Sequence, residues 1–133
     1  MSEAQTKPVE IPGTIGWNEV ITPNKEESIA FYTQLFGWTT ENMELPGGMT
    51  YTMFKQGDRP VAGCVQPDQE GVPASWLQYV SVEDLDETIQ KAKSLGASII
   101  MERVDLPMGS FAVVADPQGA TFAFWQSTGD CPS

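Results

Sequence analysis

The chain has 133 residues, which fits one domain, and 41% of them are hydrophobic, enough for a core. Its 7 basic and 18 acidic residues give a formal charge of −11. That charge argues against nucleic acid and membrane partners, because phosphate backbones and anionic lipids are negative themselves.

Residue types that are absent or rare restrict the catalytic and metal-binding chemistry that the chain can perform. The sequence has no histidine, which excludes histidine-based catalytic triads and metal ligands, so acid–base work would fall to Glu, Asp, Tyr, Lys or Cys. Two cysteines, Cys64 and Cys131, form neither a disulfide framework nor a zinc site. The N-terminus shows no signal-peptide pattern and no stretch is long enough to span a bilayer, so we expect a cytoplasmic protein.

The chain repeats itself with an offset of 60 residues. Val20 pairs with Val80, Asn24 with Asp84 and Gln66 with Gln126. We therefore expect a single domain over residues 13–127 that is built from two modules. The expected parts are a flexible arm over 1–12, module one over 13–66, a linker over 67–74, module two over 75–127 and a tail over 128–133.

Each module predicts a strand, a helix and three further strands. Asn24 and Asp84 are N-cap residue types, and each has a glutamate three residues later, which is the spacing of a capping box. Apolar residues then recur at helical intervals, and each helix is expected to end at a glycine. The apolar positions are Ile29, Tyr32, Leu35 and Phe36 in one helix, and Leu85, Ile89, Ala92 and Leu95 in the other; the glycines are Gly37 and Gly96.

Alternating strands separated by turn residues follow each helix. Asp116-Pro117-Gln118-Gly119 predicts a hairpin turn, since each residue type suits its position. The predicted strands lie at 14–22, 39–43, 49–55 and 60–66 in module one, and at 76–82, 98–104, 110–115 and 121–126 in module two.

Two βαβββ copies in a chain of this length resemble the vicinal oxygen chelate superfamily of glyoxalases, bleomycin resistance proteins and dioxygenases. Trp17-Asn18-Glu19-Val20 and Leu35-Phe36-Gly37-Trp38 are similar to the first half of its glyoxalase-like antigen branch, and Asp116-Pro117-Gln118-Gly119-Ala120 with Phe124-Trp125 to the second. The resemblance implies an α+β fold, in which two tandem βαβββ modules form a cupped mixed sheet around one cavity.

Metal-dependent members of that superfamily hold a divalent ion with ligands from the first and last strand of each module. Those four positions fall on Trp17, Gly63, Leu77 and Ala123 in this chain. None has a side-chain carboxylate or imidazole, the groups that such ions need. We therefore expect no metal and no cofactor, which argues against glyoxalase I and extradiol dioxygenase activities.

Side chains alternate across a strand, so residues two apart from these positions share the expected cavity face. Gly63 and Ala123 should leave room, while Trp17, Tyr79 and Trp125 supply flat apolar walls for a small hydrophobic or aromatic ligand. Cys64 should point to the helix side. The expected lining is Trp17, Glu19, Val61, Gly63, Val65, Leu77, Tyr79, Ser81, Thr121, Ala123 and Trp125.

Glu19 is the most informative member of this set. A carboxylate among aromatic residues should be desolvated and its pKa should rise, as in a general base or an acceptor for a ligand amine or hydroxyl. A structural salt bridge or hydrogen bond is the alternative. The repeat pairs Glu19 with Tyr79, which could move a proton with it or serve as an ordinary core tyrosine.

Three functions remain open. The first is a metal-independent binding module for a small hydrophobic or aromatic molecule. The second is a metal-free lyase or isomerase with Glu19 as general base and Tyr79 as its partner. The third is an interaction protein without a ligand, in the form of a homodimer.

Overall fold

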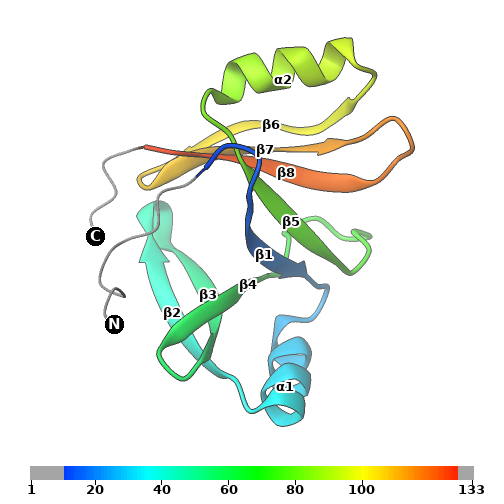
Figure 1. The fold of residues 1–133 in the computed structure, drawn as a ribbon. Helices are drawn as coiled ribbons and strands as arrows, with labels where there is room; N and C mark the ends of the chain where they lie inside the picture. Colours follow the sequence, from blue (N-terminus) through cyan, green and yellow to red (C-terminus); the bar gives the residue numbers. More distant parts are fainter. Residues whose placement is uncertain (1–10, 129–133) are drawn as a thin grey trace. The chain divides into compact units, whose positions relative to one another are not determined.

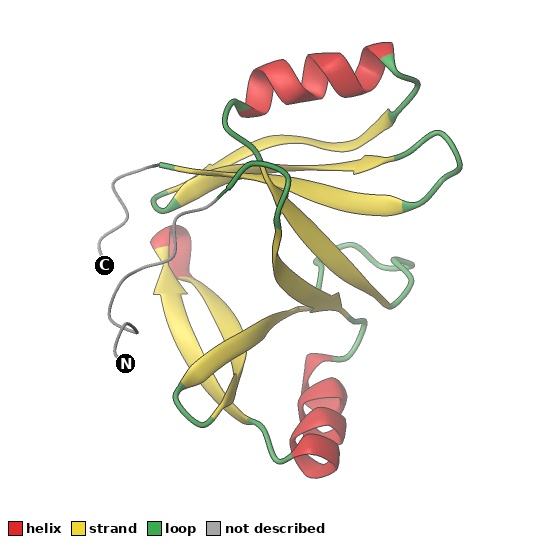
Figure 2. Ribbon diagram, viewed as in Figure 1, coloured by secondary structure: helices red, strands yellow, loops and turns green. Residues whose placement is uncertain are grey.

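The computed structural model of the protein describes residues 11–128. It is an α+β fold in which the order strand, helix, three strands occurs twice, as predicted (Figures 1 and 2). The first copy comprises β1 (Ile15–Ile21), α1 (Lys25–Phe36), β2 (Thr39–Leu45), β3 (Met49–Gln56) and β4 (Arg59–Val65), with the short 3-10 helix η2 (Pro46–Gly48) between β2 and β3. The second comprises β5 (Ser75–Ser81), α2 (Leu85–Ser94), β6 (Ser98–Leu106), β7 (Gly109–Ala115) and β8 (Thr121–Ser127).

The described chain divides into two compact units. One unit comprises residues 17–77, and the other combines residues 11–16 with 78–128. In the first, the strands follow the order β2-β3-β4-β1, and β1 runs parallel to β4 with Glu19 opposite Gly63. In the second, the order is β5-β8-β7-β6, and β5 runs parallel to β8 with Tyr79 opposite Ala123. The two units therefore repeat one topology and one register.

Both helices begin with the N-cap hydrogen bonds that the capping residues predict. The Asn24 side chain accepts a hydrogen bond from the Glu27 N–H at 3.1 Å, and Asp84 does the same for Glu87 at 3.0 Å. The reciprocal half of the capping box differs in α1, where the Asn24 N–H donates to the Thr22 hydroxyl at 3.1 Å. Thr22, two residues before the cap, thus accepts the hydrogen bond that the capping box assigns to the glutamate.

The structure shows what the repeated glutamines, Gln66 and Gln126, do. The N–H of Lys25, at the start of α1, donates to Gln66 Oε1 at 2.9 Å, and the N–H of Leu85, at the start of α2, donates to Gln126 Oε1 at 2.6 Å. The first amides of a helix have no partner within it. In each module the residue at the end of the last strand supplies that partner, which ties the helix to the sheet.

The ends of the elements also follow the predicted turn chemistry. Gly37 has a φ of 75° after α1, a left-handed conformation that glycine adopts easily. In the predicted hairpin turn, the Asp116 side chain accepts hydrogen bonds from the N–H groups of Gln118 and Ala120, both at 2.9 Å. Neither helix within residues 11–128 is long and apolar enough to cross a membrane.

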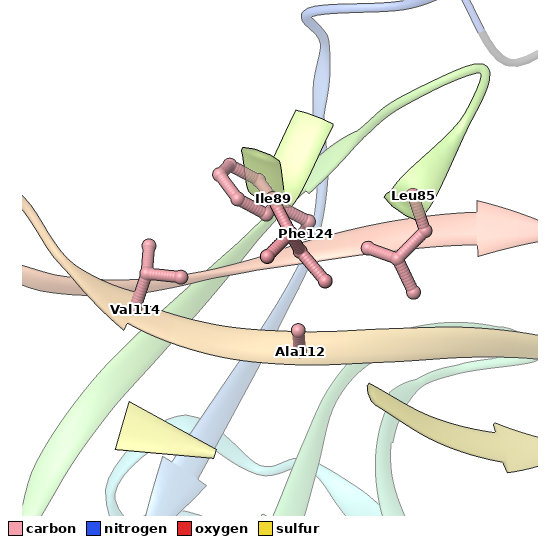
Figure 3. Packing of buried hydrophobic residues seen from close by; sticks show 5 residues of the cluster. All are labelled: Leu85, Ile89, Ala112, Val114 and Phe124. Atoms are coloured by element: carbon pink, nitrogen blue, oxygen red, sulfur yellow. The ribbon is translucent and has the colours of Figure 1, made fainter. Parts of the chain in front are cut away.

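The core of the second unit lies between α2 and its sheet. Leu85 and Ile89 of α2 pack against Ala112 and Val114 of β7 and Phe124 of β8 (Figure 3). All five side chains are buried. This arrangement leaves the opposite face of β5, β7 and β8 to the alternate residues.

The first unit packs its helix less deeply. Val20, Phe54, Ala62 and Cys64 form a buried cluster, and α1 reaches it only through partly buried Ile29 and Tyr32, with Trp38 beside them. Leu35 and Phe36, which the helical pattern grouped with these residues, are instead 57% and 56% exposed. Both lie at the end of α1, where the Phe36 ring packs on Tyr32 and Trp38 and not on the buried cluster. No residue of α1 is buried.

Candidate functional site

The first unit carries three of the predicted site residues on one face of its sheet. Val20 and Cys64 lie in the helix-side core, as predicted for Cys64, so their strand neighbours Glu19 and Gly63 face the other side. Trp17 lies two residues before Glu19 on β1 and shares that face. Leu77 of β5 belongs to the same unit and is buried.

A fourth residue, Tyr51 of β3, completes this group and was missing from the prediction. Met53 is the antiparallel partner of Gly63, and Tyr51, two residues earlier, lies diagonally across from Gly63 on the same face. The indole N–H of Trp17 donates a hydrogen bond to the Tyr51 hydroxyl at 2.9 Å. One hydrogen bond thus joins strands that are separated by 34 residues in sequence.

The space that Gly63 was expected to leave open is filled. A Cβ atom built on Gly63 would overlap the phenol oxygen of Tyr51 and lie 2.6 Å from its Cζ atom. The prediction that Gly63 provides room for a ligand is therefore wrong at this position, because the chain's own tyrosine fills it. The absent side chain permits the contact between Tyr51 and Trp17.

Charge and burial define the chemistry of this group. Glu19 is only 5% exposed. Burial raises the pKa of Tyr51 well above its usual value, and the nearby Glu19 carboxylate raises it further, while the Trp17 hydrogen bond works against this shift. Tyr51 is therefore a neutral hydroxyl at physiological pH, next to a buried carboxylate.

Cys64 lies on the other face of β4 and serves the core. Burial raises the pKa of its thiol, Lys25 lowers that pKa by its charge, and Glu19 raises it. The neutral thiol has 1% exposure and packs against Val20 and Phe54, which confirms its interpretation as a small buried hydrophobic residue. Cys131 lies outside the described residues.

In the second unit, the sheet face opposite the helix is the equivalent of the face that carries Glu19 and Tyr51, and it is apolar. Tyr79 is buried, and its ring meets that of Phe111 edge to face with centroids 6.0 Å apart. Ala123 is fully buried opposite Tyr79, whereas Thr121 at the start of β8 is exposed. The indole of Trp125 lies against the backbone of Gly109, where a Cβ atom would come within 2.5 Å of the ring.

The structure therefore brings the predicted residues together in two groups. Trp17, Glu19 and Gly63 gather with Tyr51 in the first unit, and Tyr79, Ala123 and Trp125 gather with Phe111 and Gly109 in the second. The repeat alone carried the signal for the two missed aromatic residues, because the offset of 60 pairs Tyr51 with Phe111. The predicted pairing of Glu19 with Tyr79 joins different units and stays a prediction.

The residues at the four expected ligand positions do not fit a divalent ion. The Trp17 indole is a hydrogen-bond donor, already engaged by Tyr51, and the place of a side chain at Gly63 is taken by the Tyr51 phenol. Leu77 and Ala123 are buried apolar residues. Within residues 11–128 no three His, Cys, Asp or Glu side chains lie close enough to hold a metal ion.

A separate hollow of about 260 Å³ lies in the second unit, on the helix side of its sheet. Leu95, Pro117 and Phe122 contribute to its walls. None of the predicted site residues lines it.

Comparisons with known sequences place these features in a family context. Residues 5–124 match the family model described as the glyoxalase/bleomycin resistance protein/dioxygenase superfamily. CFP32 of Mycobacterium tuberculosis, whose name describes a candidate glyoxylase, is 43% identical over 112 residues, covering 84% of this chain and 43% of CFP32. The anthracycline biosynthesis protein DnrV of Streptomyces peucetius is 35% identical over 130 residues, covering 86% of this chain and 47% of DnrV. The chain thus spans less than half the length of either relative.

Solved structures agree on the fold. A hypothetical protein of Bacillus halodurans, BH1468, superposes with a TM-score of 0.64 at 17% sequence identity, over 91% of this chain and 99% of that protein. At this identity the likeness supports the architecture and says nothing about the ligand.

Proposed function

Because the chain belongs to the glyoxalase/bleomycin resistance protein/dioxygenase superfamily, we propose that it binds a small hydrophobic or aromatic molecule without a metal ion. The ligand would contact the face of β1, β3 and β4 that carries Trp17, Glu19 and Tyr51. The observation behind the proposal is the Tyr51 phenol over Gly63, which puts a neutral hydroxyl where the resemblance expects a carboxylate or imidazole ligand to a metal ion.

The chemistry of this face suits an aromatic ligand with a polar substituent. Trp17 and Tyr51 are only partly buried, so their rings can stack against a flat ligand. The Glu19 carboxylate can accept a hydrogen bond from a ligand amine or hydroxyl, and its negative charge favours such donors over anionic groups. We therefore expect neutral or cationic aromatic molecules to bind better than aromatic carboxylates or sulfonates.

The relatives support the same class of ligand. The name of DnrV assigns that protein to anthracycline biosynthesis, and anthracyclines are fused-ring aromatic molecules. We extend to this chain only the general property of binding a flat, largely apolar molecule.

Fluorescence titration in the presence of EDTA tests the proposal. The probes are the neutral amine N-phenyl-1-naphthylamine, the cationic anthracycline daunorubicin and the anionic 1-anilinonaphthalene-8-sulfonate. We expect saturable binding of the first two, weaker binding of the sulfonate, and no gain when Zn²⁺ or Mg²⁺ replaces the EDTA in a parallel titration. Absence of saturable binding to all three, or binding that requires a metal ion, would refute the proposal.

Matched tryptophan variants locate the site. Trp17→Phe should remove most of the ligand-induced quenching and weaken binding, because it replaces the fluorescent indole by a smaller ring and removes the hydrogen bond to Tyr51. Trp76→Phe is the control, since Trp76 lies beside Tyr32 of α1, on the helix side. Equal effects of the two substitutions would place the ligand elsewhere.

A metal-free lyase or isomerase is the second candidate, and the burial of Glu19 beside the neutral Tyr51 hydroxyl favours it. Glu19 would take a proton adjacent to a substrate carbonyl, and Tyr51 would donate a hydrogen bond to the carbonyl oxygen. Glu19→Gln keeps the size of the side chain but cannot act as a base. Binding retained with exchange of the substrate proton lost would support catalysis, whereas proton exchange that persists in the variant would exclude Glu19 as the base.

A further inference from the structure

The hollow on the helix side of the second unit combines an apolar floor with two opposite charges. Its volume is about 260 Å³. The floor includes Ala92 of α2 together with Phe122 and Phe124 of β8, of which Phe124 is buried. Lys91 of α2 and Asp116, which follows β7, also line the hollow. A molecule that enters it would therefore meet apolar side chains, an ammonium group and a carboxylate.

The first unit shows which side chain occupies the equivalent position of its helix. The offset of 60 pairs Ala92 with Tyr32. Tyr32 packs against the helix-side core of the first unit, and its ring meets that of Phe54 edge to face with centroids 5.6 Å apart. Ala92 packs against the core of the second unit in the same way, but its side chain ends at the Cβ atom. The group that the second unit lacks at this position is therefore an aromatic ring.

The floor of the hollow suits an added aromatic ring. Phe122 and Phe124 lie edge to face with centroids 5.3 Å apart, and they replace the smaller Ala62 and Cys64 of the first module. Aromatic rings pack favourably against the faces and edges of others, so a ligand ring gains more here than from its apolar area alone. An apolar cavity of about 150 Å³ is enough for benzene, so this hollow can hold one ring with short substituents.

The two charged residues of the hollow select a ligand with two charges. Lys91 forms no salt bridge with another residue of the described part of the chain. The Asp116 carboxylate accepts the N–H groups of Gln118 and Ala120 at Oδ1, which leaves Oδ2 for a ligand. A zwitterion can bring a carboxylate to Lys91 and an ammonium group to Asp116. Because it has no net charge, the overall charge of −11 does not repel it as it would a simple anion.

We propose that this hollow is a second ligand site, which binds a free aromatic α-amino acid. The ring of the ligand lies on Phe122 and Phe124. Its carboxylate pairs with Lys91, and its ammonium group pairs with Asp116. A ligand of this size with charges near solvent should bind with a Kd of about 0.1–1 mM. The site is independent of the face that carries Glu19, because the two share no residue.

Nuclear magnetic resonance titration of the full chain, followed at its backbone amides, tests the proposal. The probes are L-phenylalanine, hydrocinnamate, which lacks the ammonium group, and phenethylamine, which lacks the carboxylate. L-phenylalanine should cause saturable shifts centred on Ala92, Leu95 and Asp116, and each of the other probes should bind there about 2–5-fold more weakly. Amides of β1 and β4 report on the face of Glu19, so failure of one site can be told from failure of the other.

Matched lysine variants test the role of the positive charge. Lys91→Gln and Lys93→Gln remove the same charge two residues apart on α2, but only Lys91 lines the hollow. Lys91→Gln should weaken binding of L-phenylalanine by about 2–5-fold and leave binding of phenethylamine at the hollow unchanged, because the amine has no carboxylate to lose a partner. Lys93→Gln should leave both unchanged.

A third variant tests the apolar part of the site. Ala92→Tyr introduces the residue that the first module has at this position, and its ring should fill the hollow and abolish the shifts there. If this variant fails to fold, the lysine pair still decides. The proposal is overturned by the absence of saturable shifts at the hollow with L-phenylalanine or by equal effects of the two lysine substitutions. Undiminished binding to a folded Ala92→Tyr variant, or equal affinity for the singly charged probes, would overturn it as well.

Discussion

Gly63 permits the contact between Trp17 and Tyr51, and its substitution tests that arrangement directly. In Gly63→Ala, the new methyl group would overlap the phenol oxygen of Tyr51 and lie 2.6 Å from Cζ. Gly63 is not among the glycines with positive φ, so its backbone conformation accepts alanine without strain. Any loss of stability therefore comes from the displaced ring.

Opposing contributions set the size of the effect. Alanine in a strand is favoured over glycine by about 0.5–1 kcal/mol. Forcing a ring out of a packed position costs about 1–3 kcal/mol, and loss of the Trp17 hydrogen bond costs about 0.5–1.5 kcal/mol more. We therefore expect Gly63→Ala to lower the free energy of unfolding by about 1–3 kcal/mol.

Urea unfolding followed by circular dichroism measures this change, and a second strand glycine provides the control. Gly16 also lacks a positive φ, and a Cβ atom there would meet only the Ser81 hydroxyl, at an ordinary 3.6 Å. Gly16→Ala should be neutral or raise stability by up to about 1 kcal/mol. The same residue change should thus destabilise the protein at Gly63 and not at Gly16.

A double-mutant cycle identifies the cause. In the Tyr51→Ala background the ring is gone, so adding Gly63→Ala should no longer destabilise the protein, and the coupling energy should be about 1–3 kcal/mol. Strictly additive effects, or a Gly63→Ala variant as stable as the unmodified chain, would refute the placement of the Tyr51 phenol over Gly63.

Substitutions at Tyr51, Gln126 and Asp84 have expected outcomes. The raised pKa of Tyr51 means that the folded protein keeps the phenol proton when the unfolded chain loses it near pH 10. The stability that the neutral phenol contributes is complete below that pH and falls above it. Urea titrations between about pH 9 and 11 should therefore show a steeper loss of unfolding free energy than in Tyr51→Phe, and equal slopes would contradict this. Gln126→Leu should cost about 1–3 kcal/mol in thermal or urea unfolding, because the Leu85 N–H loses its acceptor; no loss would contradict the helix-to-strand bond. Asp84→Ala should cost about 1 kcal/mol, whereas Asp84→Asn, which can still cap α2, should cost less, and a reversed order would argue against the cap.

The secondary structure could be predicted from sequence because short-range chemistry specifies it. The caps at Asn24 and Asp84 and the turn at Asp116 depend on side chains that bond backbone groups two to four residues away. The repeated glutamines were visible as a pair, but their purpose was not. Their bonds to the helix starts span 41 residues, a distance at which sequence spacing carries no geometry.

The site could be predicted only in part for the same reason. Strand alternation correctly separated Cys64 from the face of Glu19 and Gly63. It could not show that Tyr51 reaches diagonally from the neighbouring strand and fills the space above Gly63, since this depends on the β3–β4 register and on one rotamer. A glycine in a strand can indicate either open space or close approach of another group, and the second applies here.

The helix pattern failed in a related way. Periodicity shows that apolar residues share a side of a helix, but it does not show how far along the helix that side contacts the sheet. In α1, Ile29 and Tyr32 contact the sheet core. Phe36 lies on the same side at the last residue of the helix, where its ring packs on Tyr32 and Trp38 and stays 56% exposed, and Leu35 is 57% exposed. The pattern therefore counted as core two side chains that are more than half exposed.

Comparison of the two modules position by position shows where the sequence has diverged from a shared scaffold. Gln66 and Gln126 keep identical roles, and both modules keep the same strand order. Against that background, Tyr51 and Glu19 stand where the second module has Phe111 and Tyr79, and Phe31 stands where it has Lys91. A difference that the fold does not require needs another cause, since a buried carboxylate and an exposed apolar row each cost free energy in the isolated chain. The first module carries both, and the buried carboxylate is the reason that we place the ligand of the proposed function on the face that carries Glu19.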